Sequence, residues 1–288
     1  MKVARTAGEL GAGPRAVALG TFDGVHLGHR RVIETLLEAG PEPTVVTFDP
    51  HPRTALGNRV ELLTTLERRL ELLDELGVRA TLVVEFTLDI ASLKPEQFAD
   101  EVLRPIGAEA VVAGADFRFG RGRRGDLGLL ESLGFRTSAV PILEGVSSSE
   151  IRERTRAGDV EGAAALLGRP VEVEGRVVTG DARGGTLGFP TANLDVRPDL
   201  LVPANGIYAG AARDHRAAVS IGLNPHYGGS ERRVEAFLLD FAGDLYGKRL
   251  TVELWSRLRD EQAFESEEEL VAQIARDVER TRAAERPS

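Results

Sequence analysis

The first half of the chain alternates short apolar runs with amphipathic helical patterns. Five runs of four to six residues are rich in valine, leucine and phenylalanine and predict buried strands, at 17–20, 44–48, 81–86, 109–113 and 135–140. Helical patterns lie between them, at 28–39, at 61–76 and from Pro95 onward. Strands and helices that alternate in this way favour a parallel sheet covered on both faces. The expected class is α/β, with a Rossmann-like doubly wound sheet. The expected buried face of the first helix is Val32, Ile33, Leu36 and Leu37.

The pattern changes near residue 167. Two short helical patterns, at 147–156 and 159–167, end at Gly168-Arg169-Pro170. Beyond them, alternating strands separated by glycine-rich turns predict a small antiparallel Greek-key β-barrel, at 171–178, 206–212, 216–222, 234–241 and 249–258. A terminal helix begins at a Ser-x-x-Glu capping box, Ser266 and Glu269, and its expected buried face is Leu270, Val271, Ile274 and Val278. We therefore expect two domains, 1–167 and 168–288, which also suits a length of 288 residues.

Composition narrows the class of protein. Apolar residues make up 42% and charged residues 28%, as in ordinary globular proteins. Cysteine is absent, which excludes disulfides, zinc–thiolate sites and thiol nucleophiles and favours the cytoplasm. The formal net charge of −9 argues against a nucleic-acid partner, and no apolar run approaches the ~18 to 20 residues of a membrane span. Only three of the 36 basic residues are lysines: Lys2, Lys94 and Lys248.

The first candidate site is the segment Gly20-Thr-Phe-Asp-Gly-Val-His-Leu-Gly-His29, between the first strand and the first helix. Backbone N–H groups and the helix dipole converge there, which suits a phosphate chain. His26 and His29 are three residues apart, so that both rings can donate hydrogen bonds to phosphate oxygens. A metal site and a packing role are the alternatives, although the stretch lacks a carboxylate ligand. Such a site suits nucleotidyl transfer, with the two histidines as catalytic donors and these nucleotide contacts: Gly20, Phe22, Asp23, Gly24 and Gly28.

Two further segments have nucleotide or flavin interpretations. The segment Gly114-Ala-Asp-Phe-Arg-Phe-Gly-Arg-Gly-Arg-Arg-Gly-Asp126 follows a strand, where open α/β sheets bind ligands, and Phe117 and Phe119 could meet a flat ring. A charged surface loop is the alternative. The segment Ser147-Ser-Ser-Glu-Ile-Arg152 can cap a helix and present an arginine to a phosphate, or form a plain N-cap. Its candidate nucleotide contacts are Ser147, Ser148, Ser149 and Arg152.

The second candidate site is the glycine-rich segment Gly180-Asp-Ala-Arg-Gly-Gly-Thr-Leu-Gly-Phe-Pro-Thr-Ala-Asn193. It is not a P-loop, because none of the three lysines lies in it. Thr191 and Asn193 are two residues apart in an extended segment and face the same way, so both can bind one hard cation such as Mg²⁺ and its nucleotide. A turn that binds its own backbone is the alternative. The candidate nucleotide contacts are Gly180, Arg183, Gly184, Thr191 and Asn193, of which Thr191 and Asn193 are also the candidate metal ligands.

Glu235 is the candidate general base of this second site. It lies on the predicted strand 234–241, on the face of Phe237, Leu239 and Phe241. A carboxylate on a mostly apolar face is costly unless it is used or paired. As a base, Glu235 would take the proton of a substrate hydroxyl during phosphoryl transfer. A structural ion pair with Arg232 or Arg233 is the alternative.

Both halves resemble one family. Four segments resemble, in this order, the adenylyltransferase half of the prokaryotic bifunctional riboflavin kinase/FAD synthetase family: 20–29, Thr47-Phe-Asp-Pro-His-Pro52, the arginine-rich loop and Ser-Ser-Ser-x-Ile-Arg. Four further segments resemble the kinase barrel of this family: the glycine-rich segment that ends in Pro-Thr-Ala-Asn, Val234-Glu-Ala-Phe, Asp244-Leu-Tyr-Gly-Lys248 and Leu258-Arg-Asp-Glu-Gln-Ala-Phe264.

The resemblance implies two reactions in one chain. Riboflavin is phosphorylated to FMN by Mg²⁺-ATP in the second domain, and FMN is adenylylated to FAD in the first, with release of pyrophosphate. It implies that Thr191 and Asn193 bind the Mg²⁺-nucleotide, that Glu235 is the kinase base, and that His26, His29 and Arg152 contact ATP in the first domain. The residues expected to contact flavin are Phe48, Asp49, Asp116, Phe117, Arg118 and Arg259.

Two other functions stay open at this point. One half could be inactive or act on another phosphorylated small molecule, or the chain could be a non-catalytic regulator that binds nucleotide or flavin. The presence of Glu235 with Thr191 and Asn193 argues against a binder, which has no need of a placed base. Riboflavin, FMN, FAD and ATP are the expected ligands.

Overall fold

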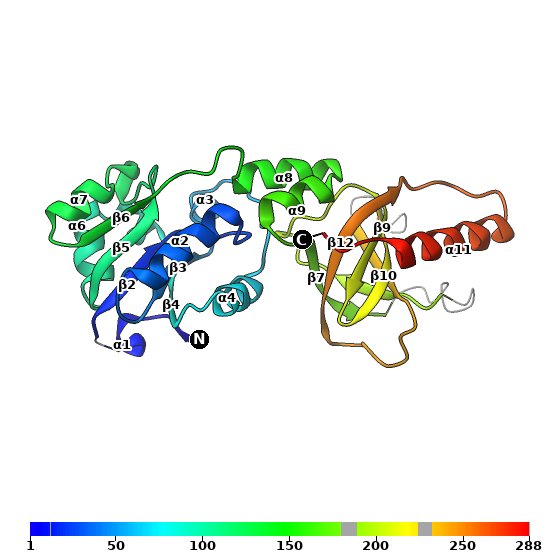
Figure 1. Ribbon diagram of the computed structural model, residues 1–288, viewed down its shortest axis with the longest axis horizontal. Coiled ribbons are helices and arrows are strands. Elements are labelled where there is room, and N and C mark those ends of the chain that lie inside the picture. Colours follow the sequence, from blue (N-terminus) through cyan, green and yellow to red (C-terminus); the bar gives the residue numbers. More distant parts are fainter. Residues whose placement is uncertain (12, 180–188, 224–231, 288) are drawn as a thin grey trace. The chain divides into compact units, whose positions relative to one another are not determined.

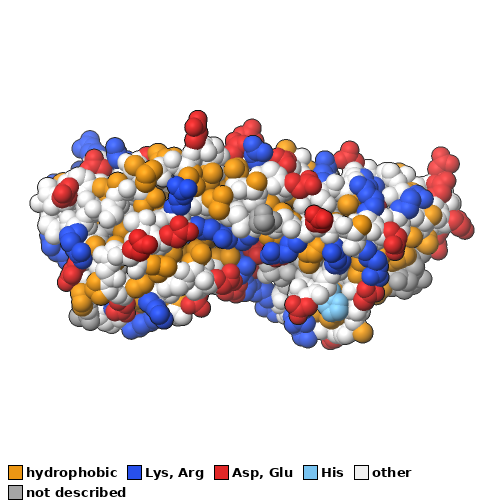
Figure 2. All heavy atoms as spheres, viewed as in Figure 1, with side chains coloured by type: hydrophobic (Ala, Val, Ile, Leu, Met, Phe, Trp, Pro, Cys, Tyr) orange, Lys and Arg blue, Asp and Glu red, His pale blue; other side chains and the backbone are white. Residues whose placement is uncertain are grey.

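The computed structural model describes residues 1–11, 13–179, 189–223 and 232–287. The chain forms two compact units, Met1–Ser147 and Ser148–Ser288 (Figure 1). The helices α8 and α9, which the sequence analysis assigned to the first domain, belong to the second unit by their contacts. Which activity each side of residue 167 carries stays a prediction. Basic and acidic side chains are interspersed over the face seen in Figure 2.

The first unit is built on a fully parallel sheet, as predicted. Its strands run in the order β1-β4-β3-β2-β5-β6, with every pairing parallel. The bounds are β1 (Lys2–Ala4), β2 (Arg15–Leu19), β3 (Thr44–Asp49), β4 (Ala80–Glu85), β5 (Ala108–Gly114) and β6 (Arg136–Val140). All five residues of β2 are buried, as expected of a central strand with helices on both faces.

Helices cover both faces of this sheet, which confirms the doubly wound class. On one face, α2 (Leu27–Glu38) and α4 (Leu66–Glu75) pack Val32, Ile33 and Leu72 against alternate residues of β2 and β5. On the other face, α6 (Pro95–Phe98) and α7 (Leu127–Ser132) pack against the other residues of β2 and β5. The π-helical turn η1 (Ala99–Leu103) continues α6. Figure 1 shows α2 crossing the strands. The shorter helices are α1 (Ala7–Leu10), α3 (Pro52–Ala55), α5 (Leu88–Ser92) and the 3-10 turn η2 (Arg121–Arg123).

The second unit contains a closed antiparallel barrel, also as predicted. Its strands follow the order β10-β11-β8-β7-β12-β9. Three consecutive strands lie side by side and β12 returns beside β9, which is the Greek-key arrangement. The bounds are β7 (Val171–Val178), β8 (Ala192–Asp195), β9 (Gly206–Ala212), β10 (His215–Leu223), β11 (Arg232–Leu238) and β12 (Arg249–Arg259). The helices of this unit within the described residues are α8 (Ser148–Ala157), α9 (Val160–Leu167) and α11 (Glu267–Ala283).

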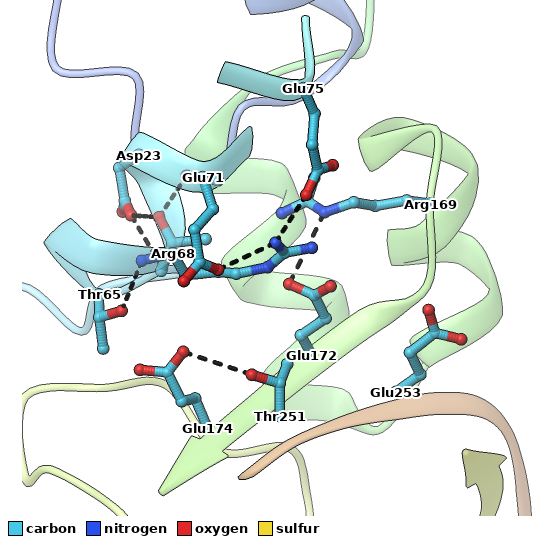
Figure 3. A network of polar contacts seen from close by, with 12 residues as sticks. Asp23, Thr65, Arg68, Glu71, Glu75, Arg169, Glu172, Glu174, Thr251 and Glu253 are labelled. Carbon is cyan, nitrogen blue, oxygen red and sulfur yellow. Dashed lines mark hydrogen bonds and ion pairs between the residues drawn. The ribbon is translucent and has the colours of Figure 1, made fainter. Parts of the chain in front are cut away.

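Side chains alternate between the inside and the outside of the barrel. In β7, Val171, Val173 and Val177 are buried, while Glu172 and Glu174 are half-buried on the outer face. These outer glutamates are paired within the unit: Glu172 lies 3.9 Å from the Nε of Arg169, and Glu174 accepts a 3.4 Å hydrogen bond from Thr251 (Figure 3). On β9, a Cβ at Gly210 would overlap the carbonyl oxygen of Glu253 on β12, so the pairing of these two strands requires glycine there.

Several predicted boundaries are wrong, for identifiable reasons. The helix predicted at 61–76 begins only at Leu66, because Thr65 caps it by accepting from the N–H of Arg68. The strand predicted at 234–241 ends at Leu238, since the chain turns at Asp240 with φ of 58°. Of the four residues expected to be buried on the terminal helix, only Val278 is buried. Leu37 on α2 was also expected to be buried, but it is 41% exposed.

Candidate functional sites

The predicted residues of the first site come from adjacent strands of the parallel sheet. The segment 20–24 follows β2, Asp49 ends β3, and the arginine-rich loop follows Gly114 at the end of β5. Because parallel strands end at one edge, these segments share the carboxyl edge of the sheet, and β2 lies between β3 and β5. Ligands of doubly wound folds bind at such a point, where the strand order reverses.

The loop after β2 is strained and held by buried side chains. Phe22 and Val25 have positive φ angles of 51° and 40°, a conformation that is rare for bulky and β-branched residues. Both side chains are buried, with 2% and 1% exposed. Strain of this kind persists only where the surroundings over-determine it, and it gathers at ligand-binding sites. The loop is therefore pre-organised.

Asp23 anchors this loop to the chain before α4. Its carboxylate is fully buried and accepts hydrogen bonds from the N–H of Leu63 at 3.0 and 3.1 Å and of Thr64 at 3.1 Å. The N–H of Gly24 in turn donates to Thr64 Oγ1 at 3.2 Å. Asp23 thus has a structural role within the site, and its predicted contact with nucleotide stays a prediction.

His26 and His29 are brought together, as the spacing predicted. Their rings stack at 3.6 Å between centroids, with planes 15° apart, and Phe22 lies 5.2 Å from His29. His26 caps α2: its Nδ1 accepts from the N–H of His29 at 3.3 Å. When the ring is neutral, its proton therefore lies on Nε2. A Cβ on Gly28 would lie only 3.1 Å from the ring, so this glycine makes room for it.

The metal alternative gains no support here. In the described part of the chain, no cluster of three or more His, Cys, Asp or Glu side chains could hold a metal ion. The site consists of two stacked imidazole rings at the N-terminal end of α2, where the helix dipole is positive. The burial of His26 and the stacking of the rings also agree with the packing alternative, so the contact of the two histidines with phosphate stays a prediction.

The predicted flavin contacts of the first unit differ in exposure. Phe48 lies half-buried at the end of β3, 5.4 Å from Phe86 in an edge-to-face contact. Phe117 stacks on Phe119 at 5.7 Å, and Phe119 is itself a core residue with 7% exposed. Phe119 therefore packs the core, whereas Phe117 is only partly covered. Three charged candidates are exposed or half-buried: Asp49, Asp116 and Arg118.

The serine-rich segment spans the point along the chain where the first unit ends and the second begins. Ser147 ends the first unit, and Ser148, Ser149 and Arg152 lie on α8 of the second. Arg152 is buried, with 7% exposed. The contact of these residues with ATP stays a prediction.

The second site joins residues 44 positions apart. The hydroxyl of Thr191 donates to Oε1 of Glu235 at 3.4 Å. Asn193 is the direct partner of Glu235 in the β8–β11 ladder. Antiparallel partners place their side chains on the same face of a sheet. Thr191, Asn193 and Glu235 are therefore gathered on one face, while Gly180, Arg183 and Gly184 lie outside the described residues.

Glu235 also forms the ion pair that was its structural alternative. Arg233 NH2 lies 2.6 Å from Oε1 of Glu235, with side chains 30% and 20% exposed. Both lie on the outer face of β11, whereas Val234, Ala236 and Leu238 point into the barrel. The expected apolar face extending to Phe241 was wrong, because β11 ends at Leu238. Glu235 is thus partly solvated, and a single carboxylate contacts both Arg233 and Thr191.

Arg259, a predicted flavin contact, is engaged with a residue that the sequence analysis missed. Its Nε and NH2 donate to Asp277 Oδ2 at 3.0 and 2.7 Å. Asp277 is 3% exposed and also accepts from Gln273 at 2.9 Å. Arg259 therefore ties β12 to α11, and its contact with flavin stays a prediction. The signal for Asp277 was its place beside Val278 on the buried stripe of the helix.

A second missed residue is Arg69 on α4. It is 2% exposed, whereas the side chain of its neighbour Arg68 is 17% exposed and pairs with Glu71 at 3.2 Å and Glu75 at 3.0 Å (Figure 3). Burial lowers the pKa of Arg69, and the negative charges of Asp23 and Asp49 oppose this shift. A buried arginine has no signal in a helical pattern, because arginine is ordinarily an exposed residue.

Comparisons with known proteins agree with this two-site architecture. A family model described as FAD synthetase matches residues 11–152, and one described as riboflavin kinase matches 167–284. The bifunctional riboflavin kinase/FMN adenylyltransferase of Listeria monocytogenes is 37% identical and covers 93% of this chain and 92% of its own. That of Escherichia coli K12 is also 37% identical, with 96% of both chains covered.

The fold has a solved counterpart. A protein from Streptococcus pneumoniae, described as a macrolide-efflux protein, superposes with a TM-score of 0.87 at 31% identity and covers 97% of this chain and 98% of its own. Among the described residues of the present chain, no helix combines the length and the apolar character of a membrane span. With 37% identity over nearly the whole length, the chain belongs to the bifunctional riboflavin kinase/FMN adenylyltransferase family.

Proposed function

We propose that this protein makes FAD from riboflavin in two steps. The barrel transfers the γ-phosphoryl group of ATP to a ribityl hydroxyl of riboflavin, which gives FMN and ADP. The parallel-sheet unit then joins the FMN phosphate to the α-phosphorus of ATP, which gives FAD and pyrophosphate. The relatives carry this pair of activities in their names, and the two family models match the two halves of the chain, at 11–152 and 167–284.

The contact between Thr191 and Glu235 is the main observation in support of the proposed kinase activity. The carboxylate of Glu235 on β11 lies 3.4 Å from the hydroxyl of Thr191, which directly precedes β8, and is paired in the ladder with Asn193, so the proposed base is next to both proposed nucleotide-binding residues. In our proposal Glu235 takes the proton of the ribityl hydroxyl as its oxygen attacks the γ-phosphorus. Partial exposure of Glu235 allows a substrate to reach it.

The donor set of this site fits magnesium. Thr191 offers a hydroxyl, Asn193 a carboxamide and Glu235 a carboxylate, all of them oxygen ligands that hard cations prefer. We propose Thr191 and Asn193 as the ligands. When bound, Mg²⁺ would neutralise charge on the nucleotide phosphates, while the chain orients the hydroxyl and accepts its proton.

The stacked histidines support the proposed adenylyltransferase activity of the first unit. In our proposal, Nε2–H of His26 and the His29 ring donate to oxygens of the ATP α-phosphate region and the departing pyrophosphate. The pre-organised loop supplies backbone N–H groups at the positive end of α2. No covalent intermediate with the protein is needed, because positioning and charge stabilisation provide the catalysis.

One assay tests both halves. Purified protein is incubated with riboflavin, ATP and Mg²⁺, and the flavins are separated by chromatography over time. FMN that rises first and is then replaced by FAD supports the proposal. FMN that accumulates without FAD contradicts the adenylyltransferase half, and unchanged riboflavin contradicts the kinase half. Supplying FMN directly tests the second step when the first is absent.

A further inference from the structure

Arg69 stands out among the residues that no predicted role uses. It is almost completely buried in the first unit, at 2% exposed. A buried guanidinium is costly unless it is paired and hydrogen-bonded. It lies on α4 and contacts the end of β3, next to two of the predicted ligand segments of that unit, the loop after β2 and the residues Phe48 and Asp49.

The contacts of Arg69 join these two segments. Its NH1 donates to Thr47 Oγ1 at 3.4 Å and to the carbonyl oxygen of Phe48 at 3.3 Å, both at the end of β3. The hydroxyl of Thr47 donates at 3.0 Å to the carbonyl oxygen of Thr21, in the loop after β2. Arg69 thus connects the predicted flavin segment at Phe48 and Asp49 with the predicted nucleotide loop.

The start of α4 holds the same loop from a second side. Asp23 of the loop accepts the N–H groups of Leu63 and Thr64, directly before the helix. The helix therefore contacts the loop through its first residues and contacts β3 through Arg69. A shift of Arg69 would move β3 and the loop relative to each other.

The hydrogen-bonding capacity of the Arg69 side chain is only partly used within the described residues. Both of its hydrogen bonds are long, and its Nε is buried without a hydrogen-bond partner in the described part of the chain. An unsatisfied buried donor is unfavourable, and such a group in a folded protein calls for an explanation, of which a role at a functional site is one.

We infer that Arg69 is a positioning residue of FMN adenylylation, which sets the nucleotide loop and the end of β3 at the separation that brings the FMN phosphate in line with ATP. This inference rests on the proposed adenylyltransferase activity and deepens it. Arg69 acts through Thr47, Phe48 and Thr21 and does not touch the reacting atoms. A misplacement of about 1 Å between reactants can cost about 100-fold in rate.

The test uses three variants of the full chain. Arg69→Met removes the donors, Arg69→Lys keeps the charge with poorer geometry, and Thr47→Val removes the connecting hydroxyl while keeping the shape. Conversion of supplied FMN to FAD is measured with each substrate varied, and riboflavin phosphorylation in the same samples reports on the other unit. Arg136→Met, a 65% exposed arginine of the same unit, is the matched control.

For Arg69→Met we expect kcat of adenylylation to fall about 100-fold with KM for ATP changed less than about threefold, and for Arg69→Lys a loss of about 10-fold. Thr47→Val should lower kcat in the same way, and the double variant should lose less than the product of the two losses, because both act through one connection. Riboflavin kinase activity and the control variant should be unchanged.

Three results are distinguishable. If the wild type converts FMN and the folded variants convert it equally well, or if KM rises while kcat is kept, the inference is overturned. If Arg69→Met does not fold, Arg69→Lys and Thr47→Val decide in the same way. If the wild type makes no FAD from FMN, the proposed adenylyltransferase activity fails, and this inference fails with it.

Discussion

Replacing Glu235 with glutamine separates the proposed role as a base from the contacts with Thr191 and Arg233. The amide keeps the size of the side chain and can still accept from Thr191 and Arg233, but it cannot take a proton. A positioned base contributes about 10² to 10⁴ in rate, which is about 2.7 to 5.4 kcal/mol of activation free energy. We therefore expect kcat of riboflavin phosphorylation to fall by that factor in Glu235→Gln.

The stability effect of the same change should be small. Glu235 and Arg233 are 20% and 30% exposed, and ion pairs near a surface contribute about 0 to 1 kcal/mol. A domain that is stable by about 5 to 15 kcal/mol stays folded after such a loss. The loss of kinase activity therefore cannot come from unfolding, and thermal melting of both proteins checks this.

Arg233→Gln is the matched control, because it breaks the same ion pair and leaves the carboxylate in place. It should keep most of the kinase activity. Flavins are separated by chromatography after incubation with riboflavin or with FMN, and Glu235→Gln should still convert FMN to FAD. The reasoning is refuted if Glu235→Gln keeps more than a tenth of the kinase rate, if both variants lose it equally, or if folded Glu235→Gln loses both activities.

Three further changes probe other parts of the molecule. His29→Ala should lower FAD formation from FMN by about 100-fold and leave riboflavin phosphorylation intact, as judged in the same chromatographic assay; equal loss of both would contradict separate sites. Asp277→Ala removes the buried partner of Arg259 and should destabilise the barrel by about 3 to 5 kcal/mol, seen as a lower midpoint in urea, whereas an unchanged midpoint would contradict a structural role. The hydrogen bond from Arg282 lowers the pKa of Asp240 below its ordinary 3.8, so the ionised form stabilises the fold above that value and the contribution is lost as the pH falls through the folded-state pKa. The melting temperature of Asp240→Asn should therefore lie below that of the wild type at pH 7 and approach it below pH 3.8, and a difference that grows in acid would contradict this.

Much of the fold follows from local patterns. The strand at 171–178 was predicted to the residue, because valine alternates with glutamate there and the burial alternates with it. The N-cap at Ser266 was confirmed, since Ser266 accepts from the N–H of Glu269, but the Glu269 side chain accepts from the N–H of Glu265, so the reciprocal bond of the predicted capping box is not formed. Two strands of the described residues were missed, β1 and β8. β1 has only three residues, and β8 has only Leu194 buried, so neither carries a periodic signal.

The sites were less predictable than the fold. His26 and His29 could be paired from their spacing, because both lie at the start of one helix. The meeting of Thr191 with Glu235 depends on a strand pairing across 44 residues, which no local pattern contains. Arg69 and Asp277 were missed because their burial depends on partners from distant segments, whereas the residue types alone predict exposure.

The pairing of β8 with β11 has a consequence for how the chain can change in evolution. Asn193 and Glu235 are directly opposite in the ladder, and side chains alternate between the faces of a strand. A one-residue insertion or deletion in either strand would turn one partner into the barrel interior. A two-residue slip would keep the face but move the partners about 7 Å apart. Natural length variation in active relatives should therefore fall in the connections between strands, while these two strands keep their length.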